Sequence, residues 1–491
     1  MTYIFPSRVI SQYCETGAIT DKNVARKSAD ALEAAASNCG GLSSIDQIIF
    51  AIDTNSSLAS VIHPFPSVAA QAVHLAGAGH IAAFDTRGPN GRADAEIMAN
   101  AYLGSGSCQR VAVIYAAQDG VKARVLEHNS QNVQRRLYSS IVSTGAYLPD
   151  AILGNVQVAK DIEREKGKEE LTPQGISQRS GADERRVARL EETLDFNGRM
   201  ALTYALRNGG KNYSDLDYLI VTSSHPDAHT VAAEALTKPR RLLVYLGCAG
   251  SCKVMEVANV LIGAGAKIVG IVATERLRDI TDKKDKDTSM LFGDGAAAMI
   301  MEASDKPGVL ASKSVTYGEL ANLITLEPKG EKLYIKMDGR AVFNFAKDQV
   351  PEPLKEFMRK NNISPDMIKA APSHQASNHI LSSQAKALGL EGKVMSIMKW
   401  CANISSASAL LAFHIGIKYG LVKPGDLVLA YAFGAGLAAT ANLIWLDDHL
   451  AVPKAPGDYL DHINSIPEVP YTFDLISGAK ETNMLRKAAQ Q

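Results

Sequence analysis

The sequence predicts a layered α/β fold. Short apolar runs alternate with helical patterns from about residue 138 to residue 450, and the first 120 residues repeat the pattern found in the middle of the chain. Strands that alternate with helices in this way build sheets covered by helices. The length of 491 residues is enough for two or three domains of ordinary size.

The predicted strands are short apolar runs that end in a turn or lead into a helix. In chain order they are DLDYLIVTSS, RLLVYLG, AKIVGIVATE, GAAAMIMEA, MIKAAPSH, DLVLAYAFGAG and ATANLIWL. The polar residues 121–136 predict a linker or a surface helix. Residues 451–491 carry several prolines without a clear period, which predicts an irregular tail.

The amino-terminal 120 residues look like a second copy of the middle. SADALEAAASNCGGLSSIDQIIFAIDT matches NGRMALTYALRNGGKNYSDLDYLIVTSSH in its helix, its glycine pair and its acid-led strand. We interpret this similarity as an internal duplication. The alternative is two unrelated α/β units that share generic patterning.

Composition excludes several function classes. Hydrophobic residues make up 46% and charged residues 21% of the chain, and the formal net charge is +0, without the basic excess of nucleic-acid-binding proteins. We recognise no secretory leader at the amino terminus and no apolar run near 18 residues, so we expect a cytoplasmic protein that does not enter membranes. The six cysteines and eleven histidines form no metal-binding motif, and we expect no bound metal.

A cysteine lies where one predicted strand turns into a helix. In RLLVYLGCAGSCKVMEVANVL the apolar run stops at Gly247, and helical spacing begins after Cys248. A helix N-terminus lowers the pKa of a thiol, which would make Cys248 a nucleophile. The alternative is a buried structural cysteine. Cys252, one helical turn later, is a weaker candidate because reactive thiols need access.

Further polar groups lie at corners of the same kind. His374 ends a strand before a helix, Asn403 lies in a turn before another helix, and the Gly434–Ala435–Gly436 turn offers backbone N–H groups. Each feature alone is common in structural roles. Because strands of a parallel sheet deliver their carboxyl ends to one side, the groups are expected to meet. Together they supply what acyl transfer requires, a nucleophile and donors for oxyanions.

Eight motifs then resemble, in the right order, β-ketoacyl-acyl-carrier-protein synthase III and its thiolase-superfamily relatives. They are STGAYLPD (143–150), GISQRSGADERRVA (175–188), DLDYLIVTSSHPD (215–227), GCAG (247–250), LFGDGAAAMIM (291–301), SHQASNHI (373–380), ANISSAS (402–408) and AFGAGL (432–437). The resemblance implies a thiolase-like fold of two βαβαβαββ halves in five αβαβα layers, here residues 137–304 and 305–450, with an additional amino-terminal α/β unit.

The resemblance also implies roles and partners. Cys248, His374 and Asn403 would be catalytic, with the backbone N–H groups of Cys248 and Ala435 as oxyanion donors. Arg185, His379 and Lys386 would contact the carrier protein or the thioester in its tunnel. The expected assembly is a homodimer, and the expected substrates are acyl carrier protein or acyl coenzyme A thioesters. No separate cofactor is expected, since the substrate carries its own phosphopantetheine.

Three departures from the family pattern suggest a specialised synthase. Gly175 replaces the tryptophan that stacks on coenzyme A, His379 replaces a carrier-binding arginine, and Ala402 replaces a glycine. Two alternatives remain open: acyl transfer to an oxygen or nitrogen nucleophile, and a non-catalytic partner subunit of an active homologue. Retention of the three polar groups counts against the second.

The amino-terminal copy lacks the catalytic cysteine. The position that matches Cys248 is Pro89 or Asn90, so we expect residues 1–120 to be a catalytically silent half-thiolase unit. This copy keeps HPFPSVAAQAVHLAGAG, a piece that the catalytic copy lacks, and we expect it to pack against the catalytic half and to replace part of the missing interface wall, within one chain or across a dimer. The alternative is an independent domain on a flexible linker.

Overall fold

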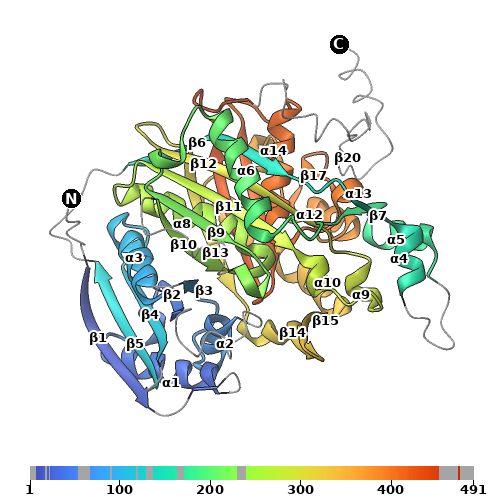
Figure 1. Ribbon diagram of the computed structural model, residues 1–491. Helices are drawn as coiled ribbons and strands as arrows, with labels where there is room; N and C mark the ends of the chain where they lie inside the picture. The colour runs from blue at the N-terminus through green and yellow to red at the C-terminus, as the bar shows by residue number, and fades with distance from the viewer. Residues whose placement is uncertain are drawn as a thin grey trace.

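Three βα units of the same design make up the chain (Figure 1). The structure, a computed structural model, describes residues 7–16, 19–20, 23–53, 67–88, 91–117, 120–128, 137–162, 171–228, 239–452 and 474–475. Each unit has five main strands, counted in chain order without the separate two-stranded sheets of the second and third units. In each unit the first strand pairs antiparallel with the fifth, and the fifth pairs antiparallel with the fourth. The fourth, second and third strands run parallel to one another. The three units therefore share one strand order and one set of pairing directions.

The first unit is the blue part of Figure 1. Its elements are β1 (Ser7–Thr16), α1 (Val24–Ser37), β2 (Gln47–Asp53), α2 (Val68–Leu75), β3 (Ala82–Gly88), α3 (Gly91–Gly104), β4 (Arg110–Ala117) and β5 (Gly120–His128). Helices α1 and α2 cover one face of its strands with a core of their own, built from side chains such as Leu32, Ile48 and Phe50. The other face packs into the central core through α3.

The second unit continues the same sheet. Its elements are β6 (Tyr138–Tyr147), β7 (Ile152–Gly154), α4 (Asn155–Asp161), α5 (Pro173–Ser180), β8 (Glu184–Arg186), α6 (Leu194–Asn208), β9 (Tyr218–Thr222), β10 (Arg240–Tyr245), α8 (Gly250–Gly263), β11 (Ile268–Arg276), α9 (Lys286–Ser289) and β12 (Asp294–Ser304). One ten-stranded sheet results, in the order β1-β5-β4-β2-β3-β10-β9-β11-β12-β6.

The third unit forms a second sheet. Its elements are β13 (Val309–Thr316), β14 (Ile324–Lys329), β15 (Lys332–Met337), α10 (Gly339–Asn344), α11 (Pro351–Lys360), β16 (Ala371–Pro372), α12 (Asn378–Leu388), β17 (Val394–Ser396), α13 (Met398–Cys401), α14 (Ser408–Lys418), β18 (Leu427–Gly434) and β19 (Ala438–Trp445). Parallel bridges from Ala370 to Val428 and from Ser373 to Tyr431 join β16 to β18.

The second and third units stack in five layers. Helices α8 and α14 lie between the two sheets, and their side chains form one core with both. Helix α6 covers the outer face of the first sheet, and α11 and α12 cover the outer face of the second. Helices α8 and α14 are buried on almost every face, as suits helices that lie between two sheets. The predicted thiolase-like arrangement is thus confirmed.

The prediction of a linker or surface helix over residues 121–136 is wrong for its first part. Residues up to His128 form β5, so the first unit extends beyond residue 120. Val121, Ala123 and Val125 are buried while the residues between them are more exposed, an alternation with period two that is typical of a half-buried strand. The charged side chains at alternate positions hid this pattern.

Several expectations fall outside the described residues. These are the corner residues Pro89 and Asn90, the first residues of HPFPSVAAQAVHLAGAG, the segment 229–238 where the catalytic copy is shorter, and nearly all of residues 453–491. Within that last segment the structure describes β20 (Asp474–Leu475), which pairs antiparallel with β17.

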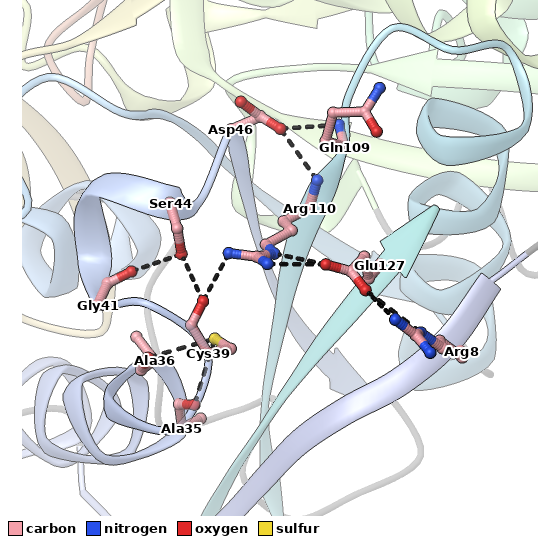
Figure 2. A network of polar contacts seen from close by, with 10 residues as sticks. All are labelled: Arg8, Ala35, Ala36, Cys39, Gly41, Ser44, Asp46, Gln109, Arg110 and Glu127. Carbon is pink, nitrogen blue, oxygen red and sulfur yellow. Dashed lines mark hydrogen bonds and ion pairs between the residues drawn. The ribbon is translucent and has the colours of Figure 1, made fainter. Parts of the chain in front are cut away.

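A polar network ties the outer strands of the first unit together (Figure 2). Arg110 on β4 donates to Glu127 on β5 at 2.8 and 2.9 Å and to the carbonyl of Cys39 at 2.6 Å, just beyond α1. Glu127 also accepts from Arg8 on β1 at 2.7 Å. Asp46 accepts from the backbone N–H of Arg110 at 2.9 Å. The network therefore links β1, β4 and β5 to the end of α1 and stabilises the first unit.

Candidate active site

Cys248 lies where β10 hands over to α8, as the sequence predicts. A 3-10 turn, Gly247–Ala249, separates the strand from the helix, and Gly247 has a φ of 48°, which glycine adopts without strain. The half-buried cysteine side chain lines a cavity of about 330 Å³. The thiol is therefore accessible from an enclosed space at the carboxyl end of a strand.

The environment of the thiol differs from the one expected. Burial raises the pKa of Cys248 to about 12, although hydrogen bonding by Ser405 and by the backbone N–H groups of Cys248 and Ala435 acts in the opposite direction. The expectation of a lowered pKa is therefore wrong for the empty cavity, because desolvation outweighs these donors. At neutral pH the Cys248 side chain is therefore a protonated thiol.

The glycine turn after β18 approaches the cysteine closely. A Cβ atom placed on Gly434 would lie 2.4 Å from the Cβ of Cys248, so only glycine fits there. This approach lets the next residue, Ala435, direct its backbone N–H at the sulfur. Two backbone N–H groups therefore point at the same place, the arrangement of an oxyanion hole.

His374 is a buried neutral imidazole. It follows β16, its backbone N–H donates to Tyr431 at 3.0 Å, and its ring lies edge-on to Phe433 at 5.3 Å between centroids. Burial lowers the pKa of His374 to about 3. Its Nδ1 atom is buried without a hydrogen-bond partner among the described residues. At neutral pH the ring therefore donates from one nitrogen only.

Asn403 lines the same cavity with its carboxamide held in one orientation. Its Oδ1 accepts from the backbone N–H of Ser405 at 2.8 Å, so the opposite end of the carboxamide is the N–H donor. Backbone bonds to Leu291 and Gly293, at 2.9 and 3.0 Å, fix the turn against β12. Cys248, His374 and Asn403, far apart in sequence, thus surround one space.

A chain of buried hydroxyls behind the thiol was not identified from the sequence. The Sγ atom of Cys248 lies 3.2 Å from Oγ of Ser405, which lies 2.5 Å from Oγ of Ser224. Ser224 in turn donates its backbone N–H to Glu275 at 2.9 Å. Glu275 stands at the carboxyl end of β11, a position that could have marked it.

Glu275 is a buried carboxyl group with a raised pKa. Burial raises the pKa of Glu275 to about 7, against hydrogen bonds from Ser406 and Ser224 that favour the charged form. Ser406 donates both its hydroxyl, at 2.5 Å, and its backbone N–H, at 3.1 Å. A carboxyl group with this pKa exchanges its proton near neutral pH.

The three tunnel residues are placed differently from one another. His379 and Lys386 are exposed on α12, and Nε2 of His379 lies 2.8 Å from the carbonyl of Gln178. Arg185 is fully buried and donates to Asn155 and to the carbonyl of Met290. It supports the wall and does not face the cavity, which corrects the prediction for Arg185. Arg179 on α5 lines the cavity instead.

Cys252 lies outside the cavity. It is fully buried, and burial raises its pKa to about 12.

The part of the chain that the structure describes contains no cluster of three or more metal-ligating side chains. Nor does any described helix have both the length and the apolarity needed to cross a membrane.

Comparison with known proteins agrees with this geometry. Two family models match, 3-oxoacyl-[acyl-carrier-protein] synthase III over residues 244–318 and the C-terminal domain of the same synthase over residues 358–445. The β-ketoacyl-[acyl-carrier-protein] synthase III of Aquifex aeolicus is 31% identical over 317 residues, which are 62% of this chain and 99% of that protein. The synthase III of Psychromonas ingrahamii is 30% identical over 327 residues, with the same coverage.

Solved structures show the same relationship. The Aquifex aeolicus synthase III superposes with a TM-score of 0.57 at 29% identity, covering 62% of this chain and 99% of that one. The priming β-ketosynthase of the R1128 polyketide pathway superposes with a TM-score of 0.58 at 26% identity, covering 65% and 98%. More than a third of this chain has no counterpart in the Aquifex protein.

The fold and the site define an acyl-transferring enzyme of the thiolase-like class. A thiol beside two backbone N–H groups, with an imidazole and a carboxamide across the same cavity, has the groups that such transfer uses. The chain belongs to the β-ketoacyl-acyl-carrier-protein synthase III family.

Proposed function

We propose that the protein condenses two acyl thioesters through an acyl-cysteine intermediate. The convergence of Cys248, His374 and Asn403 on one cavity, with the Ala435 N–H at the sulfur, carries this proposal. In the first step the Cys248 sulfur attacks the donor thioester. The backbone N–H groups of Cys248 and Ala435 hold the oxyanion, and the donor's own thiol leaves with the proton that Cys248 gives up.

The second step forms a carbon–carbon bond. His374 and Asn403 donate hydrogen bonds to the carbonyl of a second thioester and stabilise its enolate while a malonyl-type carboxylate leaves as CO₂. The enolate carbon attacks the acyl group on Cys248, and the cysteine sulfur leaves and takes up a proton. A neutral His374 suits this step because it can donate without first being protonated.

We propose a carrier-protein thioester as the preferred second substrate and acyl donor. Gly175 on α5 offers no ring to stack on the adenine of coenzyme A, while His379 and Lys386 stay exposed on α12 for a carrier surface. The names of the Aquifex and Psychromonas relatives include the acyl carrier protein. Phosphopantetheine would arrive with the substrate, and no further cofactor takes part.

We propose that residues 137–304 and 305–450 are the two halves of the catalytic body and that the first unit is a silent half, in a cytoplasmic protein. The homodimer implied by the family resemblance stays a prediction.

Intact-mass measurement after incubation with a panel of acyl thioesters tests the proposal. The wild-type protein should gain the mass of the acyl group. Cys248→Ala should gain nothing, whereas the matched variant Cys252→Ala should load normally because Cys252 lies outside the cavity. Adding a malonyl thioester should then release a β-keto product. An adduct on Cys248→Ala, or an ester or amide product in place of the β-keto product, would contradict the proposal.

A further inference from the structure

The ten-stranded sheet is mirrored about its centre. Read outward from the junction of β3 and β10, one side runs third, second, fourth, fifth and first strand of the first unit, and the other side runs in the same sequence through the second unit. The two central strands pair antiparallel, with Thr86 opposite Val244 and Asp85 opposite Tyr245. Figure 1 shows the blue unit beside the green strands of the catalytic half.

This mirrored order is the geometry of a twofold dimer. In such a dimer the same surface of both subunits meets, so equivalent strands pair antiparallel across the axis. Here the equivalent third strands pair in this way, and the equivalent helices that follow them, α3 and α8, pack against each other within the central core. One chain therefore contains an arrangement that two identical subunits would otherwise have to supply.

Buried charges on the catalytic side of the junction are completed by the first unit. Lys253 on α8 is fully buried, and its Nζ donates to Glu256 at 2.8 Å and to Oε1 of Gln47 at 3.0 Å. The same Nζ lies 4.9 Å from the ring of Phe84. The hydroxyl of Tyr102 donates to Glu256 at 2.7 Å. Lys253 and Glu256 neutralise each other, and Gln47 and Tyr102 of the first unit complete the hydrogen bonding of this buried pair, which would otherwise be left with unmet donors and acceptors.

The first unit also reaches the wall of the cavity. A Cβ on Gly318 would lie 2.1 Å from the carbonyl oxygen of Ala70 on α2, so the two backbones are in close contact. The ring of His80 packs on Tyr317 at 4.8 Å, and Tyr317 packs on Phe345 at 5.1 Å. Phe345 lines the cavity that contains Cys248. The first unit thus supports both the cysteine-bearing helix and the opposite wall.

We propose that the first unit is a built-in second subunit, which occupies the sheet edge at β10 so that the active species is a single chain. A second copy could pair with β10 only if β3 left it. That exchange would strip Lys253 and Glu256 of their contacts with Gln47 and Tyr102. The proposal concerns assembly alone and holds whatever acyl acceptor the site uses.

Light scattering on the full chain during size-exclusion chromatography gives the first test. The expected particle mass is 52.5 kDa across the concentration range used for activity. A particle of twice that mass would overturn the proposal.

A cleavable chain gives the second test. A protease site is inserted between residues 131 and 132, and the chain is cut there; the two fragments should then still elute together and load Cys248 with an acyl group. Gln47→Ala in the cleaved protein should weaken their association about tenfold or more, since a hydrogen bond to a buried charge is lost. The control Gln12→Ala, exposed on β1 at the far sheet edge, should leave it unchanged. Fragments that separate at once, or equal effects of the two variants, would overturn the proposal.

Discussion

Replacing Glu275 with glutamine should change how stability depends on pH. Burial raises the pKa of this carboxyl group from 4.5 to about 7 in the folded protein. Between these two values the folded state holds a proton that the unfolded state has released, so folding is favoured at low pH and loses that advantage as pH rises. The difference between 4.5 and about 7 corresponds to roughly 3 kcal/mol of unfolding free energy. The Glu275→Gln variant should lack this loss.

Urea unfolding at pH 5, 6, 7 and 8 measures the effect. The wild-type stability minus that of Glu275→Gln should fall by roughly 2.5 kcal/mol from pH 5 to pH 8, because part of the full difference is already lost at pH 5. The loss of hydrogen bonds from Ser406 would lower the unfolding free energy of the variant by a similar amount at all four pH values, and would leave the dependence of the difference on pH unchanged. Glu391→Gln, at an exposed position, serves as the control and should show no trend. A Glu275→Gln variant that keeps the wild-type pH dependence would refute the reasoning.

The same charge acts on the nucleophile. The ionised Glu275 contributes to the raised pKa of Cys248, after burial itself. The Glu275→Gln variant should therefore let iodoacetamide alkylate Cys248 at lower pH than the wild type does, as followed by peptide mass spectrometry. An unchanged pH profile would show that the hydroxyls of Ser405 and Ser224 isolate the thiol from this carboxyl group.

Three further predictions concern catalysis, donor choice and folding. Alanine at His374 or Asn403 should spare acyl loading and slow condensation roughly 10²–10³-fold, since the proposed mechanism has each residue donate one hydrogen bond to the enolate, and equal damage to both steps in a stopped-flow assay would count against it. A carrier-protein donor should have a higher kcat/KM than the matching coenzyme A thioester, and Gly175→Trp should narrow the gap, whereas comparable values in the wild type would contradict the role given to Gly175. Ala402→Gly should raise the unfolding free energy by about 1 kcal/mol in urea titrations, because Ala402 has a φ of 56° that suits glycine, and a loss of stability would show that the alanine is unstrained.

Local pattern was enough to predict the corners of the fold. Cys248, His374 and Asn403 each follow a short apolar run, and parallel strands bring such positions to one side of a sheet, so the meeting of these groups could be expected. The spacing of these residues along the chain does not predict the distances between them in the folded protein, however. The close approach of Gly434 to Cys248, and the resulting direction of the Ala435 N–H, needed the packed structure.

The features that were missed depend on burial and long-range pairing. The thiol pKa was expected to fall because a helix dipole is visible in sequence, whereas the desolvation that outweighs it is not. Arginine side chains usually lie at the surface, but that of Arg185 lies in the core. The pairing of β3 with β10 joins segments that are more than a hundred residues apart in the sequence. The hydrophobic periodicity within either segment does not predict which strand it will pair with.

The asymmetry of the mirrored sheet has a kinetic consequence. A symmetric dimer carries two equivalent active sites that can influence each other across their shared axis, as cooperative oligomers do. Here the cavity that contains Cys248 lies on one side of the junction, and the strand that faces β10 belongs to the first unit, which we propose to be catalytically silent. The proposed single-chain assembly has one such site per particle, so saturation by an acyl donor should be hyperbolic, with a Hill coefficient of one. An enzyme built in this way would keep the structural support of a partner subunit and lose the means to respond cooperatively to substrate concentration.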